Sequence, residues 1–114
     1  MKTRRDDTLY LDDMLHETAN ISEFTRGMSR DSFLSSELVR RAVERSVQII
    51  GEAAKGLSED FKRDHSEIEW RKIIAMRNLI THAYGDVDYF AVWEVVVRDI
   101  PEFERSLQAI KKNG

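Results

Sequence analysis

Apolar residues recur at helical spacing between residues 36 and 57, and this pattern constrains the fold of the 114-residue chain more than any other feature. They lie one, three or four positions apart, at Val39, Ala42, Val43, Val47, Ile50, Ala53, Ala54 and Leu57. Such spacing gives a helix one apolar face, which must be buried against other elements. Ser35 or Ser36 can cap its start and Gly56 can mark its end. We therefore expect a long amphipathic helix here.

One glycine lies inside this expected helix. Gly51 costs about 1 kcal/mol relative to alanine in a helix interior. The direct explanation is that another helix approaches closely at this point, and the alternative is a functional role.

The rest of the chain has the same helical character. Further helices are expected at about residues 7–26, 59–63, 68–83 and 88–111, with a connection at 27–32. Asp88 can cap the last of them. Pro101 should kink or restart the last of these helices, because it removes a backbone donor and clashes with the preceding turn. No internal repeat or interdomain linker interrupts residues 1–114. The sequence predicts a single all-α domain.

The segment from Arg77 to Tyr84 places a guanidinium, an imidazole (His82) and a phenol within eight residues. A guanidinium can bind a phosphate through two parallel hydrogen bonds, and histidine readily carries a proton near neutral pH. On an ideal helix Arg77 falls within the apolar face centred on Ile73, where a charge is costly unless it is paired or reaches solvent. Because such departures concentrate at functional sites, these residue types suggest phosphodiester chemistry without a metal.

Helical geometry separates the two candidate groups. Arg77 and His82 lie about 140° apart on an ideal helix. They converge only if the helix ends near Thr81, if the arginine curls around the helix, or if a second chain supplies one of them.

A structural interpretation of the same residues stays open. The stem of Arg77 could cover apolar surface, and His82 could cap a helix that stops at Gly85. An arginine five positions before a histidine occurs by chance in roughly one chain in ten of this length. The spacing alone therefore favours the structural interpretation.

Composition limits the classes of function. The chain has no cysteine, so it has neither a disulfide framework nor a thiolate metal site. No apolar run approaches a membrane span, and the N-terminus leads into acidic residues, so we expect a cytoplasmic protein. The net charge of -3 argues against an extended nucleic-acid stripe. It permits a local basic cleft built from Arg77 with Lys72 or Arg71.

Arginines on the long central helix allow two interpretations. Arg40, Arg41 and Arg45 can be surface charges paired with Glu37 and Glu44. They can also form a patch that faces a partner or RNA, and the sequence leaves both open.

The run RNLITHAY (77–84) resembles the R-x4-H-x-Y signature of the HEPN superfamily, and specifically of the HepT-like ribonuclease toxins. Four other runs are also similar to that family: LDDM (11–14), GEAAK (51–55), WRKII (70–74), and Trp93 with IPE (100–102). The likeness covers essentially the whole chain in order and spacing, which makes it more specific than the short motif.

The resemblance implies a role for each matching residue. Arg77 and His82 match the catalytic pair of the family, and Asn78 matches a supporting polar residue. Tyr84 matches the tyrosine to which a minimal nucleotidyltransferase antitoxin attaches adenylate. The implied reaction is cleavage of RNA by attack of the 2′-hydroxyl on the adjacent phosphate, without a metal or other cofactor.

The resemblance also implies an assembly. Family members are up-and-down bundles of four to five helices that form homodimers, with both motifs facing one cleft. We therefore predict an endoribonuclease toxin with RNA as substrate and a nucleotidyltransferase antitoxin as partner, in a complex of undetermined stoichiometry. One alternative is a non-catalytic helical binding module that serves the nucleotidyltransferase, with Arg77 and His82 only binding phosphate. The other is a purely structural bundle.

Overall fold

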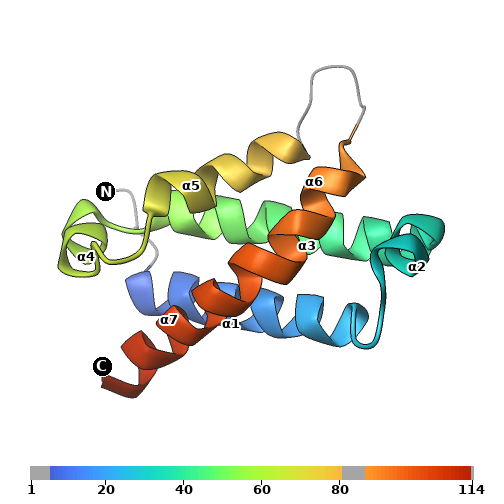
Figure 1. The fold of residues 1–114 in the computed structure, drawn as a ribbon. Coiled ribbons are helices and arrows are strands. Elements are labelled where there is room, and N and C mark those ends of the chain that lie inside the picture. Colours follow the sequence, from blue (N-terminus) through green and yellow to red (C-terminus); the bar gives the residue numbers. More distant parts are fainter. Residues whose placement is uncertain (1–5, 81–86, 114) are drawn as a thin grey trace.

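Two long antiparallel helices form the support on which the rest of the chain packs (Figure 1). The structure is a computed structural model that describes residues 6–80 and 87–113. Helix α1 (Asp7–Phe24) lies along helix α3 (Glu37–Gly56). The side chain of Ser36 accepts a hydrogen bond from the backbone N–H of Val39 at 3.2 Å, so the predicted cap and the predicted end of the central helix are both confirmed.

The expected connection at 27–32 is partly wrong, because a short helix, α2 (Arg30–Ser35), begins within it. Ser29 and Ser32 form a reciprocal capping box that starts this helix. Phe33 anchors it in the core, with its ring centroid 5.1 Å from that of Trp93. The turn before it uses Gly27 at a φ of 74°, which glycine adopts without strain.

The second half of the chain lies over this pair as shorter segments. Helix α4 (Glu59–Asp64) begins after Ser58, as predicted, and the side chain of Ser58 caps it. It is followed by α5 (Trp70–Ala75) and the 3₁₀ turn η1 (Met76–Leu79). After the undescribed residues 81–86 come α6 (Tyr89–Glu94), the π-helical turn η2 (Val95–Asp99) and α7 (Ile100–Asn113). The last of these runs obliquely across α1 (Figure 1).

Pro101 is accommodated by the π turn that precedes it. The backbone N–H of Ile100 donates to the carbonyl of Val95, five residues back instead of four. A proline ring would clash with the carbonyl four residues before it in a regular α-helix, and the wider turn relieves that clash. The expected kink or restart thus takes the form of a π turn within one continuous helical rod.

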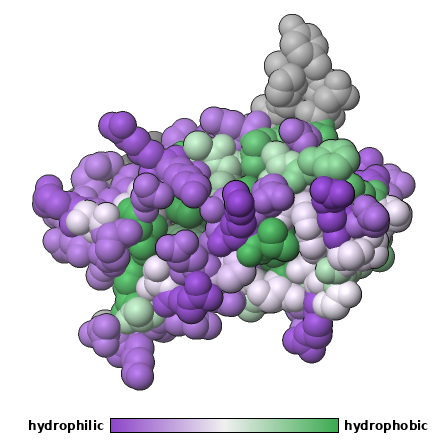
Figure 2. Space-filling model, viewed as in Figure 1, coloured by the Kyte–Doolittle hydropathy of each residue, from purple (hydrophilic) through white to green (hydrophobic). Residues whose placement is uncertain are grey.

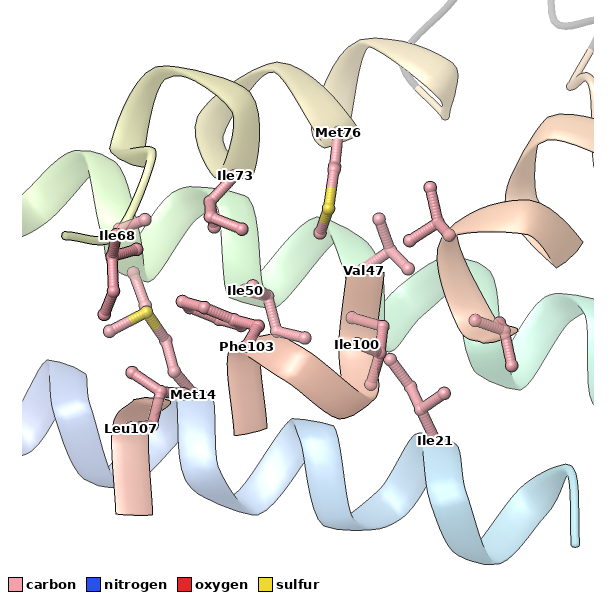
Figure 3. Packing of buried hydrophobic residues seen from close by; sticks show 14 of the residues in the cluster. Met14, Ile21, Val47, Ile50, Ile68, Ile73, Met76, Ile100, Phe103 and Leu107 are labelled. Atoms are coloured by element: carbon pink, nitrogen blue, oxygen red, sulfur yellow. The ribbon is translucent and has the colours of Figure 1, made fainter. Parts of the chain in front are cut away.

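The core lies between α1, α3, α5 and α7. Figure 3 shows side chains from all four elements meeting in one interior, among them Met14, Ile50, Ile73 and Phe103, which are all at most 5% exposed. The all-α prediction is confirmed for the described residues, although they form more and shorter helices than the four to five expected. Within those residues, no helix combines the length and the apolar character needed to cross a membrane.

Candidate functional site

The structure describes the first half of the motif, from Arg77 to Ile80. Thr81 to Asp86 lie outside the described residues, and they include the predicted catalytic His82 and the predicted modification site Tyr84. The roles of these two residues therefore stay predictions, and the geometry of the site is built here from Arg77 and its supports.

The helix that carries the motif is anchored firmly at its start. Trp70 is only 7% exposed, and its Nε1–H donates to the carbonyl of His65 at 3.0 Å. Its ring packs edge-on against Phe103 of α7, with centroids 6.1 Å apart, and at the same centroid distance from Phe61. A large aromatic side chain that is both buried and hydrogen-bonded holds the beginning of α5 in one place.

The motif itself begins on a different kind of turn. The prediction of an α-helix from about 68 to 83 is wrong for residues 76–79, because they form a 3₁₀ turn, after which the Ile80 N–H donates to the Arg77 carbonyl at 3.0 Å. A 3₁₀ turn advances about 120° per residue instead of 100°, so the angle of 140° inferred for an ideal helix does not apply. Apolar residues three or four positions apart fit either turn, and periodicity could not separate them.

Arg77 lies in the packed face, as its position in the pattern predicted. The residue is half-buried, and its Cβ lies so close to α3 that a Cβ added at Gly51 would be 2.9 Å away from it. The predicted reason for Gly51, close approach of another helix, is therefore confirmed. The first carbons of the arginine side chain lie against α3, as the structural interpretation also required. A guanidinium is a group that can bind a phosphate through paired hydrogen bonds.

Asn78, the predicted supporting residue, lies next to Arg77 on η1 and is exposed. Leu79 and Ile80 are half-buried and pack against the core. Within this single turn, some side chains therefore pack against the core and others face solvent, and Arg77 is half-buried between these two groups.

Lys72 does not extend a basic surface beside Arg77. Its Nζ lies 3.1 Å from a carboxylate oxygen of Asp99 on η2. The hydrogen bond and the charge of Asp99 raise the pKa of Lys72, with a smaller contribution from Glu69. The structure therefore does not support Lys72 as part of the basic cleft considered from the sequence, because its ammonium group pairs with the carboxylate of Asp99.

A second cluster joins α3 to the start of α6, and the sequence offered no signal for it. The hydroxyl of Tyr89 donates to Glu44 at 2.6 Å, and the guanidinium of Arg40 lies 4.9 Å from the centroid of the tyrosine ring. Burial, and then the hydrogen bond to Glu44, raise the pKa of Tyr89. Asp88 caps α6 as predicted, accepting from the N–H of Ala91 at 3.1 Å.

The contacts of the central arginines support the first interpretation, in which they are charges paired within the chain. Arg40 also donates to the carbonyl of Leu34 at the end of α2, which occupies it inside the fold. Arg41 pairs with Glu37 at 3.2 Å, and Arg45 donates to Gln48 at 3.1 Å. Each of the three arginines therefore has a partner within the chain. Glu44, which the sequence offered as a partner for an arginine, instead accepts a hydrogen bond from Tyr89.

Among residues 6–80 and 87–113, no three side chains of the His, Asp or Glu type gather as they would around a metal ion.

Comparison with known proteins places these features in a family context. A sequence model of the family described as "Ribonuclease HepT-like" matches residues 14–110. A Thermococcus cleftensis protein named "Probable ribonuclease HepT" is 40% identical over 90% of this chain and 94% of its own length. A protein of Caldanaerobacter subterraneus subsp. tengcongensis named as a "Putative RNase" is 37% identical over 96% of each chain. No solved structure matches the chain.

Proposed function

The chain belongs to the HepT-like ribonuclease family, and on that premise we propose that it is an endoribonuclease acting as the toxin of a toxin–antitoxin pair. The family match spans the whole motif, and the relatives named as ribonucleases align along nearly their full lengths. The observation that carries the proposal is the setting of Arg77, a half-buried arginine at the start of the motif whose Cβ and Cγ lie against α3.

The proposed reaction is an internal transesterification. The 2′-oxygen of a ribose loses its proton and attacks the adjacent phosphorus, and the bond from phosphorus to the 5′-oxygen of the next nucleotide breaks. His82 accepts a proton from the 2′-hydroxyl or donates one to the leaving 5′-oxygen. Arg77 binds the phosphoryl oxygens, on which negative charge grows, and so takes the electrostatic role that a metal ion has in other nucleases.

The packed stem supports this role for Arg77. An arginine on a flexible surface loop must lose much of its side-chain freedom when it binds phosphate. Here the first carbons of the side chain already pack on α3, so less freedom remains to be lost. Asn78 is exposed beside it and is proposed to support substrate binding through its amide.

Tyr84 is the proposed control point. Adenylation of its hydroxyl by a nucleotidyltransferase antitoxin would add a bulky anion within the motif. That group would compete with RNA phosphate for Arg77 and would occupy space that the substrate needs.

The active species is proposed to be a homodimer in which two motifs face one cleft. Large apolar side chains on the surface support self-association: Leu38 is 81% exposed and Phe90 is 60% exposed. In the view of Figure 2, hydrophilic side chains cover most of the surface, and apolar residues show between them in several places. Phe90 follows the motif by only six positions, which places one of the exposed apolar residues on the helix after it.

Cleavage of a labelled RNA by purified protein in excess chelator tests the catalytic proposal. We expect the wild type to cut, and Arg77→Ala and His82→Ala to lose cutting. Arg105→Ala is a control for loss of an arginine, because Arg105 is an exposed arginine on α7, outside the motif. If demonstrably dimeric, unmodified wild type cuts none of several RNA classes, the non-catalytic binding module becomes the better description.

Growth of cells that make the protein alone tests the toxin proposal. The wild type should arrest growth and His82→Ala should not. Equal growth at matched protein levels would contradict the proposal.

A further inference from the structure

Gly51 lies at a close contact between α3 and the start of the motif. A Cβ built at this glycine would lie 2.9 Å from Arg77 Cβ and 3.6 Å from Arg77 Cγ. It would also lie 3.5 Å from the carbonyl oxygen of Ile74. The two segments therefore approach more closely here than any residue with a side chain would permit.

The atom that an added methyl group would meet cannot move by itself. Carbon atoms in contact prefer separations of roughly 3.5–4.0 Å, so an alanine at position 51 requires a displacement of roughly half an ångström or more. Arg77 Cβ is bonded directly to the backbone, and a rotation about χ1 leaves it in place. The displacement must therefore be taken up by η1, by α3, or by both.

The surroundings prevent η1 from moving freely. Ile73 and Met76, on either side of the contact, point from α5 and η1 into the core (Figure 3). They are 5% and 4% exposed, and Trp70 fixes the start of the same unit. A shift that relieves the clash therefore tilts or rotates the turn around these anchors, and it redirects the bond from Cα to Cβ of Arg77.

A small redirection at that bond becomes larger at the end of the side chain. The guanidinium lies four bonds beyond Cβ, and phosphate recognition by an arginine depends on the orientation of its planar fork. Catalytic groups must be held within about 0.5 Å of the productive geometry.

We propose that Gly51 is a positioning residue of the site, whose missing side chain sets the depth and direction from which Arg77 meets the phosphate. This inference rests on the proposed ribonuclease function and adds to it a residue that lies on another helix, 26 positions before Arg77 in the chain.

Gly56 provides a matched control on the same helix. A Cβ at Gly56 would lie 2.5 Å from Cζ of Tyr10 and 2.8 Å from its hydroxyl oxygen, so it also meets a neighbour. That neighbour is the tip of a half-buried side chain on α1, which can rotate away without moving a backbone. Gly51→Ala and Gly56→Ala thus make the same chemical change in α3, but only the first acts on Arg77.

The experiment compares the wild type with Gly51→Ala and Gly56→Ala by two readouts. The first is steady-state cleavage of a labelled RNA oligonucleotide. Gly51→Ala should lower kcat/KM by about tenfold to a hundredfold, mostly through kcat, while Gly56→Ala stays near wild type. The second is the ¹H–¹⁵N resonance of Arg77 Nε–H, assigned by its absence in Arg77→Lys. It should move in Gly51→Ala and stay in place in Gly56→Ala.

Three results would overturn the inference. The first is an unmoved Arg77 resonance with unchanged kcat, and the second is an equal effect of the two glycine substitutions. The third is a loss of folding in Gly51→Ala that does not come from the contact with Arg77. If Gly51→Ala does not fold, the double variant that combines Gly51→Ala with Arg77→Gly tests for this third result. Recovery of the native circular dichroism spectrum in the double variant supports the inference, because the clashing Cβ has been removed. Failure to recover overturns it.

The two proposals fail in different ways. If the wild type cuts no RNA, the ribonuclease function is wrong, and the Arg77 resonance still decides whether Gly51 positions that side chain. If the wild type cuts RNA and Gly51→Ala cuts as well with an unmoved resonance, the function stands and the positioning role is wrong.

Discussion

The two ends of the helical unit that leads into the motif are built differently. At its start, Trp70 is buried, hydrogen-bonded and surrounded by aromatic rings from α4 and α7. At its end, the 3₁₀ turn η1 carries a half-buried Arg77 and an exposed Asn78. The first end uses its largest side chain for stability, while the second places a charged group where packing alone would favour an apolar one. The contrast indicates that α5 is a support and η1 is the part that it positions.

Trp70→Ala should give the largest effect on stability. Removing a buried tryptophan from a packed aromatic cluster destabilises proteins by about 3–5 kcal/mol, and the carbonyl of His65 also loses one of its two donors, keeping the backbone N–H of Ile68. The midpoint of urea unfolding, followed by circular dichroism, measures the loss. A change of less than about 1 kcal/mol would mean that the start of α5 is not the anchor described here.

Arg77→Ala should show the opposite pattern. Loss of a group that stabilises developing charge lowers kcat by about a hundredfold to a thousandfold. Unfolding free energy should change by about 1 kcal/mol or less, because only the stem of the arginine packs on α3. RNA cleavage and urea unfolding, measured on the same preparations, check both halves. If Arg77→Ala cuts RNA normally but has a much lower free energy of unfolding than the wild type, the result contradicts this prediction and favours a structural role for Arg77.

Asp88→Ala extends the comparison to the helix that follows the motif. The Asp88 carboxylate accepts the hydrogen bond that starts α6, and loss of such a cap costs about 1 kcal/mol. Asp88→Ser retains an accepting oxygen and should restore most of the unfolding free energy. If both variants are equally destabilised, the cap does not account for the contribution of Asp88.

Tyr89→Phe should have the smallest effect at neutral pH and a visible one at alkaline pH. The pKa of Tyr89 is raised above its usual value of 10.0 in the folded protein, so the unfolded chain releases this proton first as pH rises. Stability from this group is therefore complete below pH 10 and is lost as pH rises through the folded pKa. Urea midpoints at pH 8 and pH 10.5 should fall more for the wild type than for Tyr89→Phe. Parallel falls would show that Tyr89 does not contribute.

Local chemistry made most of the helices predictable. Ser36 and Asp88 each supply a capping oxygen at a helix start, and both were identified from sequence because a cap acts within one turn. Helix α2 was missed because its six residues are too few to show a periodic pattern. Its capping pair, Ser29 and Ser32, was the available signal.

In the described part of the candidate site, the setting of Arg77 was predictable from sequence and the geometry of its turn was not. Arg77 was identified from residue type, and its half-buried setting followed from its place in the apolar pattern. The 3₁₀ turn could not be predicted, because apolar spacing is the same for an α-helix and a 3₁₀ helix over one turn. The pairing of Lys72 with Asp99 was also not foreseen, because it joins residues 27 positions apart.

The sequence by itself determined the helical character of the chain, the caps of its main helices, the motif and its family. Each depends on residues within a few positions of one another or on an ordered pattern along the chain. Only the tertiary structure decided that Gly51 lies against Arg77, that Tyr89 binds Glu44 and that Lys72 turns away to Asp99. These contacts join segments brought together by burial of a shared core, and the pairings that result depend on how the helices cross.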